Sequence, residues 1–516
     1  MKVIFIIPPA LSHRTSEENL GVGYLTSVLR KNSYNVSIID AWLENLSFDE
    51  IKFRICQELE TSEKILMFGI STYVSNLEPT EKIISFIKAT IDIPIVAGGF
   101  GPSFFIDDFL DRGVDIVSIG EGENTILELC QYFENEQEWS NISGIAYRQN
   151  GITIKTQPRQ LIDNLDSIPF PARDTINFTF SKKSSVNILS SRGCMGHCKF
   201  CSVIAFQKLS NGKIWRQRSI KNFVDELEAL NKQGVDFFKI IDDSFIEYPR
   251  DSNWCKELYN EISSRKIKIR LRGSMVAERI TEETVYYLKQ SGFFSFACGI
   301  ENFSDSALKR LGKRASKNDN IKALNILKKF NMYVQCGFIL FDPYTTIDEL
   351  RENLYYMKQY KWILCKGIFS ELYAAKGTEF TNELLINSKN GELLSKNENY
   401  IYDIRDDTVK KIYLALKEWQ KSYDKLYDLI IDPLTAPKNI SFESMEELYD
   451  IYLKIREDDL DIFEKLLNNK NNDYMEIVQN KINDCKHFRE KTLKAGIKIY
   501  EKEQLRFESE KNKYLT

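Results

Sequence analysis

The chain has 516 residues, of which 43% are apolar and 28% are charged, and its formal net charge at pH 7 is −4. This length predicts two or three globular domains, and the near balance of charge argues against a protein that mainly coats nucleic acid. The five apolar residues after Lys2 form too short a run for a signal peptide, and no uncharged apolar run is long enough to cross a bilayer. We therefore expect a cytoplasmic protein with reduced thiols and with neither a nucleic-acid nor a membrane partner.

Residues 1–150 alternate apolar strands with amphipathic helices, which predicts an α/β domain. The expected strands lie at 2–9, 35–40, 64–72, 93–100 and 114–123. Because their apolar runs are continuous, each strand is expected to be buried on both faces of a parallel sheet. The sequence therefore predicts a doubly wound, Rossmann-like parallel sheet as the N-terminal domain.

Small and Gly-rich segments follow three of these strands, at 71–76 (STYVSN), 98–103 (GGFGPS) and 120–124 (GEGEN). Such sheets bind ligands at the carboxyl ends of their strands, and glycine lets a ligand approach the backbone closely, although a plain turn would explain any one segment. The G-x-G-x-x-G fingerprint is absent after the first strand, which disfavours nicotinamide and flavin. The candidate cofactor-binding residues are Ser71, Thr72, Gly98, Gly99, Phe100, Ser103, Gly120 and Glu121.

A connector with prolines at 169 and 171 spans residues 151–184 and is interpreted as a domain boundary. Strand–helix alternation then resumes in residues 185–378, with expected strands at 186–193, 237–245, 268–275, 293–301, 333–341 and 362–373. Six such units predict a partial (β/α)6 barrel of the TIM type. Barrels of this kind carry their chemistry at the carboxyl ends of the strands.

Residues 379–516 are charged and have a helical pattern. Between 407 and 430, apolar residues recur every three or four positions and form one face of an amphipathic helix, at Val409, Ile412, Leu416, Trp419, Tyr423, Leu426 and Ile430. We expect this helical C-terminal domain to pack against the barrel or against a neighbouring helix. A lid over the substrate is the alternative.

Three of the ten cysteines, Cys194, Cys198 and Cys201, fall within eight residues just after the first barrel strand. The other seven lie mostly in apolar or helical runs and are interpreted as buried apolar residues. Structural zinc sites usually have four protein ligands, and His197, the immediate neighbour of Cys198, is a poor fourth ligand. Three thiolates on a cubane iron–sulfur cluster leave one iron free for a substrate or cofactor, and two glycines in the segment allow the tight loop that wraps such a cluster.

The segment GCMGHCKFC, residues 193–201, resembles the C-x3-C-x-φ-C signature of radical S-adenosylmethionine (SAM) enzymes, with Phe200 as the aromatic residue φ. The resemblance implies a [4Fe-4S] cluster on the three cysteines, with an open iron that chelates the amino and carboxylate groups of SAM. It also implies that one electron, from a donor such as flavodoxin or ferredoxin, splits SAM into methionine and a 5′-deoxyadenosyl radical. The barrel would position the reactants and exclude water.

The ends of the second and third barrel strands can be compared with the same family. Relatives carry a Gly-Gly-Glu-type segment for the SAM amino group, and this chain has Asp242, Asp243 and Ser244 there instead. Asp243 and Ser244 are therefore the candidates for that contact. Arg272 and Ser274, which end the third strand, are expected to face the carboxylate or the ribose of SAM.

The fourth and fifth strands supply the remaining SAM candidates. Glu301 is expected to bind the ribose hydroxyls. The segment GFILF on the fifth strand resembles the apolar segment that lines adenine in the family, so Phe338 and Phe200 are expected beside the adenine ring. A buried salt bridge or barrel packing is the alternative role for these residues.

The N-terminal domain resembles the cobalamin-binding domain that precedes the barrel in one radical SAM subclass. The matching segments are the Pro pair after the first strand, GVGYLTSVLR, GIST, VAGGFGPS and VDIVSIGEGE. The D-x-H-x-x-G motif that presents a histidine to cobalt is absent, and His13 is the only histidine of this domain. Cobalamin is therefore expected to bind without an axial histidine from the protein; loss of cobalamin binding is the alternative.

The resemblance to class B radical SAM methyltransferases implies methylcobalamin as the methyl carrier. It also implies methylation of an unactivated carbon in a small-molecule or peptide natural product. A cyclase, ring-contraction or oxidation enzyme that uses cobalamin without methyl transfer is the alternative, and a non-catalytic iron–sulfur protein is less favoured. A transfer-RNA methylthiotransferase also joins an α/β domain to this barrel, but it carries three cluster cysteines where residues 1–150 have only Cys56 and Cys130.

Overall fold

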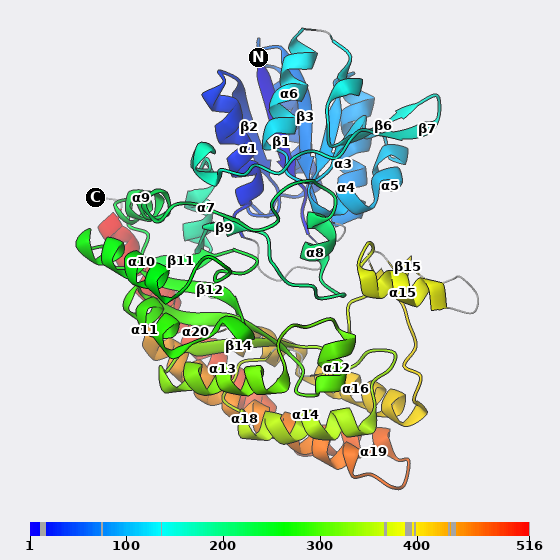
Figure 1. The fold of residues 1–516 in the computed structure, drawn as a ribbon, viewed down its shortest axis with the longest axis vertical. Helices are drawn as coiled ribbons and strands as arrows, with labels where there is room; N and C mark the ends of the chain where they lie inside the picture. The colour runs from blue at the N-terminus through cyan, green and yellow to red at the C-terminus, as the bar shows by residue number, and fades with distance from the viewer. Residues whose placement is uncertain are drawn as a thin grey trace.

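The computed structural model describes residues 1–10, 17–73, 76–135, 137–365, 369–387, 395–396, 399–431, 434 and 440–514. His13 and part of the predicted segment 71–76 lie outside the described residues. Figure 1 shows the N-terminal α/β domain at one end of the long axis, and the barrel with the C-terminal helices at the other.

A seven-stranded sheet forms the core of the N-terminal domain, in the order β2-β1-β3-β4-β5-β6-β7. Its strands are β1 (Lys2–Ile7), β2 (Asn35–Asp40), β3 (Ile65–Ser71), β4 (Ile95–Gly98), β5 (Ile116–Ser118), β6 (Ile145–Gln149) and β7 (Ile152–Lys155). The first five strands are parallel, as predicted, and β6 and β7 add an antiparallel edge. The predicted boundary at residue 150 therefore separates two paired strands, β6 and β7, and is corrected to a point after Lys155.

Helices cover both faces of this sheet and bury almost every residue of its central strands β1, β3, β4 and β5. They are α1 (Leu20–Lys31), α2 (Phe48–Leu59), α3 (Leu77–Thr90), α4 (Phe100–Phe104), α5 (Ile106–Asp111) and α6 (Glu123–Glu134), and a short 3-10 helix η2 (Trp139–Asn141) follows. Alternate residues of β1 face two separate cores: Val3 and Phe5 lie in the core under α1 and α6, and Ile4 and Ile6 in the core under α2, α3 and α5.

The second sheet is parallel, with the order β14-β13-β12-β11-β8. Its strands are β8 (Val186–Ile188), β11 (Phe237–Ile240), β12 (Arg270–Val276), β13 (Phe293–Glu301) and β14 (Tyr333–Phe338), and a small hairpin of β9 (Ser191–Arg192) and β10 (Arg216–Gln217) lies beside them. The sixth predicted strand, 362–373, is reduced in the described residues to the bridges Gln335–Leu364 and Phe341–Glu371, while residues 366–368 lie outside the description.

The helices around this sheet are α7 (Ile176–Ser181), α8 (Ser202–Gln207), α9 (Ile220–Asn231), α10 (Ser252–Ser264), α11 (Glu282–Gln290), α12 (Asp305–Arg310), α13 (Lys317–Lys329) and α14 (Ile347–Gln359), with 3-10 turns η3 (Leu165–Ser167) and η4 (Ala277–Arg279). Ser219, Thr281 and Thr346 cap α9, α11 and α14 with their side chains, as the sequence pattern predicts.

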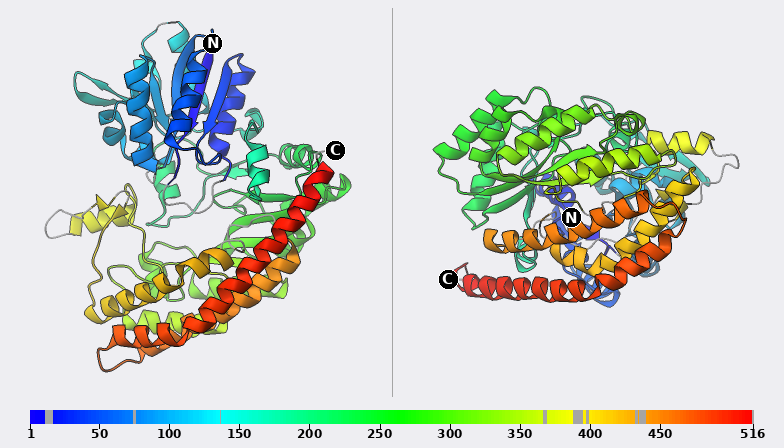
Figure 2. Two further views of the ribbon diagram at one scale, coloured as in Figure 1. Left: turned by 180° about the vertical axis from the view of Figure 1, so that it is seen from behind. Right: turned by 90° about the horizontal axis from the view of Figure 1, so that it is seen from below.

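The C-terminal region is helical and shares one hydrophobic core with the barrel. It comprises α15 (Glu379–Asn387), a small hairpin of β15 (Ser395–Lys396) and β16 (Asn399–Tyr400), α16 (Asp407–Ile430), α18 (Phe442–Leu467), α19 (Tyr474–Asp484) and α20 (Lys486–Tyr514). All seven residues predicted for the apolar face of α16 are buried. Figure 2 shows the long helices of this region packed alongside the barrel sheet, with α20 (red) as the outermost.

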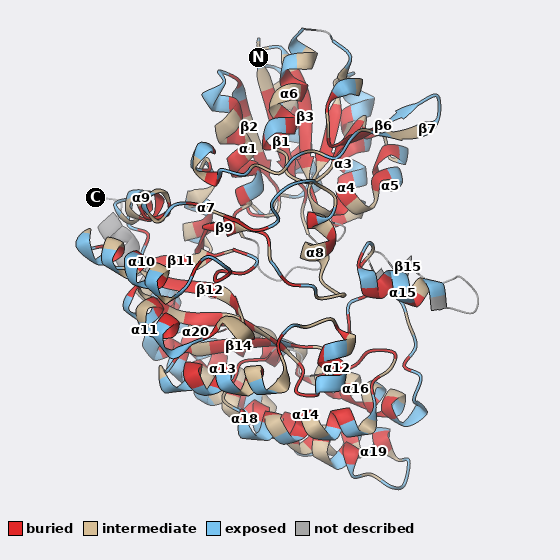
Figure 3. Cartoon of the chain, viewed as in Figure 1, coloured by how far each residue is buried: buried red, intermediate tan, exposed pale blue. Residues whose placement is uncertain are grey.

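Burial is concentrated in the two sheets and on the helix faces that cover them (Figure 3). In the described part of the chain, no helix combines the length and the apolar composition that a membrane span needs.

A buried ion-pair triad joins the connector to both domains. Arg173 donates to Glu18 at 2.5 Å and to Glu226 at 2.7 Å, and the side chains of the two glutamates are only 2% and 3% exposed. We expect Arg173→Met to lower the free energy of unfolding by about 3 kcal/mol, because two buried carboxylates lose their shared cation. Denaturant unfolding followed by circular dichroism measures this loss.

Arg148→Met is the matched control, because Arg148 pairs with Asp107 and Asp111, whose side chains are each 64% exposed. Removing a solvent-exposed pair should cost less than about 1 kcal/mol. Equal losses in the two variants would contradict the role assigned to the triad.

Candidate active site

The three cysteines lie on the loop between β9 and α8, at the carboxyl end of the barrel sheet. The thiols of Cys194, Cys198 and Cys201 are half-buried and free. Gly193 begins the loop with φ at +93°, and a Cβ on it would lie 2.2 Å from the carbonyl oxygen of Ile214. Only glycine therefore fits where the chain turns into the loop.

Burial raises the pKa of all three thiols, and that of Cys194 to about 12. The thiols are consequently protonated at neutral pH, and metal binding there must release their protons. Within the described part of the chain, no three His, Cys, Asp or Glu side chains converge as ligands of a single ion would. Three free thiols on one loop are the donor set of a cubane cluster, in which each thiolate binds its own iron.

Glu247 is a fully buried carboxylate beside Cys194 that sequence reasoning missed. Its Oε1 lies 3.7 Å from Cys194 Sγ and accepts from the Met195 N–H at 3.4 Å. Arg314 donates to the same oxygen at 3.1 Å and to the Met195 carbonyl oxygen at 3.0 Å. Glu247 and Arg314 together hold the first half of the cysteine loop.

Glu301 ends β13 with φ at +57°, a conformation that is costly for a residue with a side chain. Its carboxylate is paired with Lys313 Nζ at 3.3 Å, and that ammonium also donates to the Gly299 carbonyl oxygen at 2.9 Å. The Cβ positions of Gly299 and Gly337 would lie only 3.1 and 3.5 Å from the Glu301 oxygens, so the carboxylate lies over a strip without side chains. The strained backbone is typical of a functional position.

Three neighbouring residues in the segment after β11 have different surroundings. Asp242 is buried and accepts from Ser190 N at 2.7 Å and Ser191 Oγ at 2.6 Å. Asp243 accepts from Gly193 N at 3.1 Å and lines a cavity, and burial raises its pKa to about 6. Ser244 is completely buried, and its hydroxyl has no hydrogen-bond partner.

One of the predicted SAM residues, Phe338, lies elsewhere than expected. The Phe338 ring packs on Phe303, with centroids 5.7 Å apart, in the core between the sheet and α14. It therefore faces away from the inner surface of the barrel, and Ile339, which shares an apolar cluster with Phe200, takes its place near the loop. Arg272 is buried on the inner surface and donates to Ser295 and Gln335, whereas Ser274 lies two residues nearer the strand's carboxyl end.

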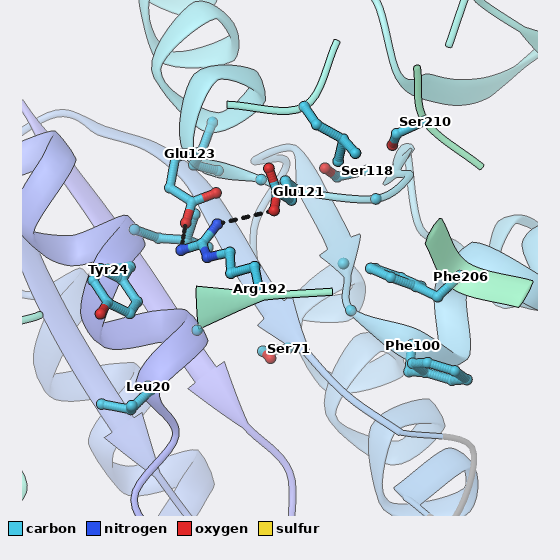
Figure 4. A pocket seen from close by; sticks show the side chains of 18 of the residues that line it. Leu20, Tyr24, Ser71, Phe100, Ser118, Glu121, Glu123, Arg192, Phe206 and Ser210 are labelled. Atoms are coloured by element: carbon cyan, nitrogen blue, oxygen red, sulfur yellow. Dashed lines mark hydrogen bonds and ion pairs between the residues drawn. The ribbon is translucent and has the colours of Figure 1, made fainter. Parts of the chain in front are cut away.

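A cavity of about 420 Å³ lies between the carboxyl ends of the N-terminal sheet and the cysteine loop. Ser71, Gly98, Gly99, Phe100, Gly120 and Glu121, all predicted, line it. From the barrel side it is lined by Arg192, Gly193 and Asp243, and sequence reasoning did not find Tyr24, Phe206 or Ser210 among its walls. Figure 4 shows these side chains around one space.

Thr72 and Ser103 support the glycine loops and are absent from the cavity lining. The Thr72 hydroxyl donates to the Tyr73 carbonyl oxygen at 2.8 Å. The Ser103 hydroxyl donates to the Gly99 carbonyl oxygen at 2.8 Å and accepts from Gly120 N at 3.4 Å.

Charge pairing across the cavity links the two domains. Arg192 pairs with Glu121 at 3.2 Å and with Glu123 at 2.5 Å, and Arg216 donates to both oxygens of Glu121 at 2.9 Å (Figure 4 shows the Arg192 contacts). Burial acts to raise the pKa of Glu121, but the two arginines outweigh it and hold that pKa below its ordinary value. The Glu121 carboxylate is therefore a domain contact as well as part of the wall.

The cavity suits a flat corrin ring in two respects, its glycine loops and its aromatic wall. Gly99 and Gly120 have φ of +101° and +81°, and a Cβ on them would lie 3.2 Å from the Thr72 carbonyl oxygen and 2.5 Å from Ser210 Oγ. The stacked rings of Phe100 and Phe206, 5.2 Å apart, form an apolar wall. No histidine is among the described residues that line it.

Gly193→Ala should prevent cluster assembly, because the added methyl collides with a backbone carbonyl that cannot move independently of β10. We expect the purified, anaerobically reconstituted variant to lose most of its bound iron and sulfide and its visible cluster absorbance. Iron and sulfide analysis measures the effect.

Gly151→Ala is the control, since this glycine has φ at +78° but nothing within 4 Å of its Cβ position. It should cost about 1 kcal/mol of stability through backbone strain and leave the iron content unchanged. Full iron loading of Gly193→Ala would contradict the steric argument.

Family models match both domains of the chain: the B12 binding domain at residues 11–130 and the radical SAM superfamily at residues 188–354. An uncharacterized methyltransferase of Pyrococcus horikoshii, PH0819, is 27% identical over 70% of this chain and 78% of its own length. The anaerobic magnesium-protoporphyrin IX monomethyl ester cyclase of Synechocystis is 26% identical over 72% of this chain and 78% of its own length.

Among solved structures, the cobalamin-dependent S-adenosylmethionine radical enzyme OxsB with aqua-cobalamin bound superimposes with a TM-score of 0.76 at 19% identity. That match covers 100% of this chain and 81% of OxsB. The fold, the two family models and the cysteine loop agree, and the chain belongs to the radical SAM enzymes that carry an N-terminal cobalamin-binding domain.

Proposed function

We propose that this enzyme is a cobalamin-dependent radical SAM methyltransferase that acts on an unactivated carbon of a small molecule or peptide. The observation that carries the proposal is the shared cavity: Gly98 and Gly120 of the N-terminal sheet line the same space as Gly193 and Asp243 beside the cysteine loop. A corrin held in that space would lie beside the loop that carries the cluster, and a substrate at the mouth of the barrel would reach both cofactors.

The cofactors supply the reactive species: when bound, the reduced cluster delivers the electron that cleaves SAM, and methylcobalamin delivers the methyl group. Cys194, Cys198 and Cys201 would hold the cluster. The glycine loops at 98–99 and 120 and the rings of Phe100 and Phe206 would hold the corrin. The protein's own work is to fix the two groups at one cavity and to keep water from the space between them.

We assign the SAM contacts to four residues. Asp243 accepts from the ammonium group, because it is the carboxylate that lines the cavity next to Gly193. Ser274 faces the SAM carboxylate or ribose, Glu301 accepts from the ribose hydroxyls, and Phe200 lies against adenine. Glu301 is supported by its strained backbone, and Phe200 by its apolar neighbours around Ile339.

We propose that cobalamin is held without an axial imidazole from the protein, because the D-x-H-x-x-G motif is missing from the sequence. Cyclisation or ring contraction without methyl transfer is the second candidate, and the relative named as a magnesium-protoporphyrin cyclase favours it. The two outcomes differ in product mass.

We infer a small electron-transfer protein such as a flavodoxin or ferredoxin as the reductant. Met195 and Tyr248 flank buried Glu247 at the cysteine loop and are 39% and 73% exposed. This exposed pair offers the donor an approach to the cluster from outside the substrate space.

Radical cleavage and methyl transfer have separate tests. Reconstituted and reduced enzyme given SAM should form 5′-deoxyadenosine, and Cys198→Ala should form none. With SAM carrying a deuterated methyl group, a methyltransferase yields a product that retains the labelled methyl. An unlabelled product of altered mass would support the cyclase alternative, and deoxyadenosine formation by Cys198→Ala would contradict the radical mechanism.

SAM binding should depend on pH through Asp243. Because burial raises its pKa to about 6, the carboxylate is charged above that pH and gains a proton as the pH falls through it. We expect SAM affinity to be full at pH 7.5 and to fall roughly tenfold toward pH 5, as a charge-assisted hydrogen bond is lost.

Asp243→Asn should bind SAM about tenfold more weakly at pH 7.5 and should lose most of this pH dependence. Equilibrium dialysis with labelled SAM, using unreduced enzyme, measures both. An unchanged pH profile in the variant would remove Asp243 from the SAM site.

A further inference from the structure

A polar layer crosses the inner surface of the barrel below the cysteine loop. Lys239 is in register with Asn187 on one side and with Arg272 on the other, and Arg272 is in register with Ser295. The guanidinium of Arg272 also donates to Gln335 on β14. We call these five residues, Asn187, Lys239, Arg272, Ser295 and Gln335, the lumen floor.

The inner surface around the lumen floor is more open than the outer surface. On β14, Val334, Cys336 and Phe338 are buried against helices, whereas Gln335 is half-buried and Gly337 is exposed. On β13, Ser295 is buried, and the inward positions beyond it, Ala297, Gly299 and Glu301, are half-buried. The strands therefore present an accessible inner face that leads from the lumen floor to the Glu301 carboxylate.

The charges at the lumen floor do not balance. Glu17, from the N-terminal domain, contacts Lys239 Nζ at 2.7 and 2.8 Å, and that pair is neutral overall. Arg272 donates to the uncharged Ser295 Oγ at 2.9 Å and to Gln335. Among the described residues no carboxylate lies within ion-pair distance of Arg272, whose side chain is almost completely buried.

An unpaired buried cation is costly, by several kcal/mol in real proteins. Burial lowers the pKa of Arg272 to about 10, and the charge of Glu17, which is itself paired with Lys239, offsets this effect only in part. A guanidinium also presents donors in a fork that matches the two oxygens of a carboxylate or a phosphate. The lumen floor therefore carries one positive charge that no carboxylate balances. That charge is on Arg272, whose guanidinium is suited to binding an oxyanion.

We propose that the lumen floor binds an oxyanion group of the substrate, a carboxylate or a phosphate, through Arg272 with Lys239 beside it. The inference rests on the proposed function and narrows its substrate to an anionic molecule. Anchored there, the substrate extends along the inner face past Gly337 toward Glu301 and the cysteine loop. Arg272, assigned from sequence to SAM, becomes a substrate-specificity residue.

Calorimetric titration of unreduced, SAM-free enzyme with inorganic phosphate, and separately with acetate, at constant ionic strength tests the proposal. Wild-type enzyme should bind at least one of these anions with a dissociation constant below about 10 mM. Arg272→Gln should weaken that binding at least tenfold, and Arg272→Lys, which keeps the charge, should recover part of it. Tighter binding of phosphate identifies a phosphorylated substrate, and tighter binding of acetate a carboxylic acid.

Arg270→Gln is the matched control, because this arginine is two residues away on the same strand but contacts Asp236 and the Ile440 carbonyl oxygen at the outer edge. It should bind the anions as the wild type does. Circular dichroism verifies that each variant is folded. Equal affinity in wild type and Arg272→Gln, or no binding of either anion to the wild type, would overturn the proposal.

These titrations need neither reduction nor SAM cleavage, so their outcome is separate from that of the methyl-transfer test. Loss of anion binding in Arg272→Gln without labelled product would leave the lumen floor standing and remove the methyltransferase. If labelled product forms but anion binding does not depend on Arg272, the methyltransferase proposal stands and the anion site at the lumen floor is refuted.

Discussion

An ion-pair network holds the cysteine loop against the N-terminal domain, and the placement of both cofactor sites depends on it. Arg192 stands immediately before Gly193 and Cys194, and its guanidinium is bound by Glu121 and Glu123 at the start of α6. Arg216, on the paired strand β10, donates hydrogen bonds to both carboxylate oxygens of Glu121. These side chains are 3–14% exposed. Removing one partner would therefore leave a buried charge unpaired and would lower the free energy of unfolding by about 3–5 kcal/mol. The network thereby fixes the distance between two cofactor sites on different domains.

Much of the architecture was predictable because it follows from local patterns. Continuous apolar runs identified the parallel strands, three-four spacing identified α16, and the cysteine spacing identified the cluster loop. What failed depended on partners distant in sequence. Strand β7 is exposed or half-exposed like a connector, and it is a strand only because β6 offers it an edge. The sixth strand, with its apolar composition, forms only isolated bridges in the described residues.

In the candidate site too, residues with a local sequence signal were predicted, and residues that act through distant contacts were not. The glycine-rich loops were found because their residue type carries the signal, and six of the eight predicted residues line the cavity. Phe338 was misplaced because a strand's two faces differ by one residue, and the ring faces α14. Glu247, Arg192 and Arg314 act through contacts 50 or more residues away, which no local pattern encodes. Arg272 was predicted from sequence to face SAM, and its contacts with Ser295 and Gln335 on the neighbouring strands emerge only from strand register.

The central claim is that one cavity brings the corrin and the cluster together. Electron paramagnetic resonance of the enzyme loaded with cobalt(II) cobalamin and a reduced cluster tests it directly, because two unpaired spins at adjoining walls of a cavity broaden and split each other's signals. The account predicts such spin–spin coupling in the wild type, and its weakening in Arg192→Gln, where the domain contact is lost. Two independent, unbroadened signals in the fully loaded wild-type enzyme would contradict it.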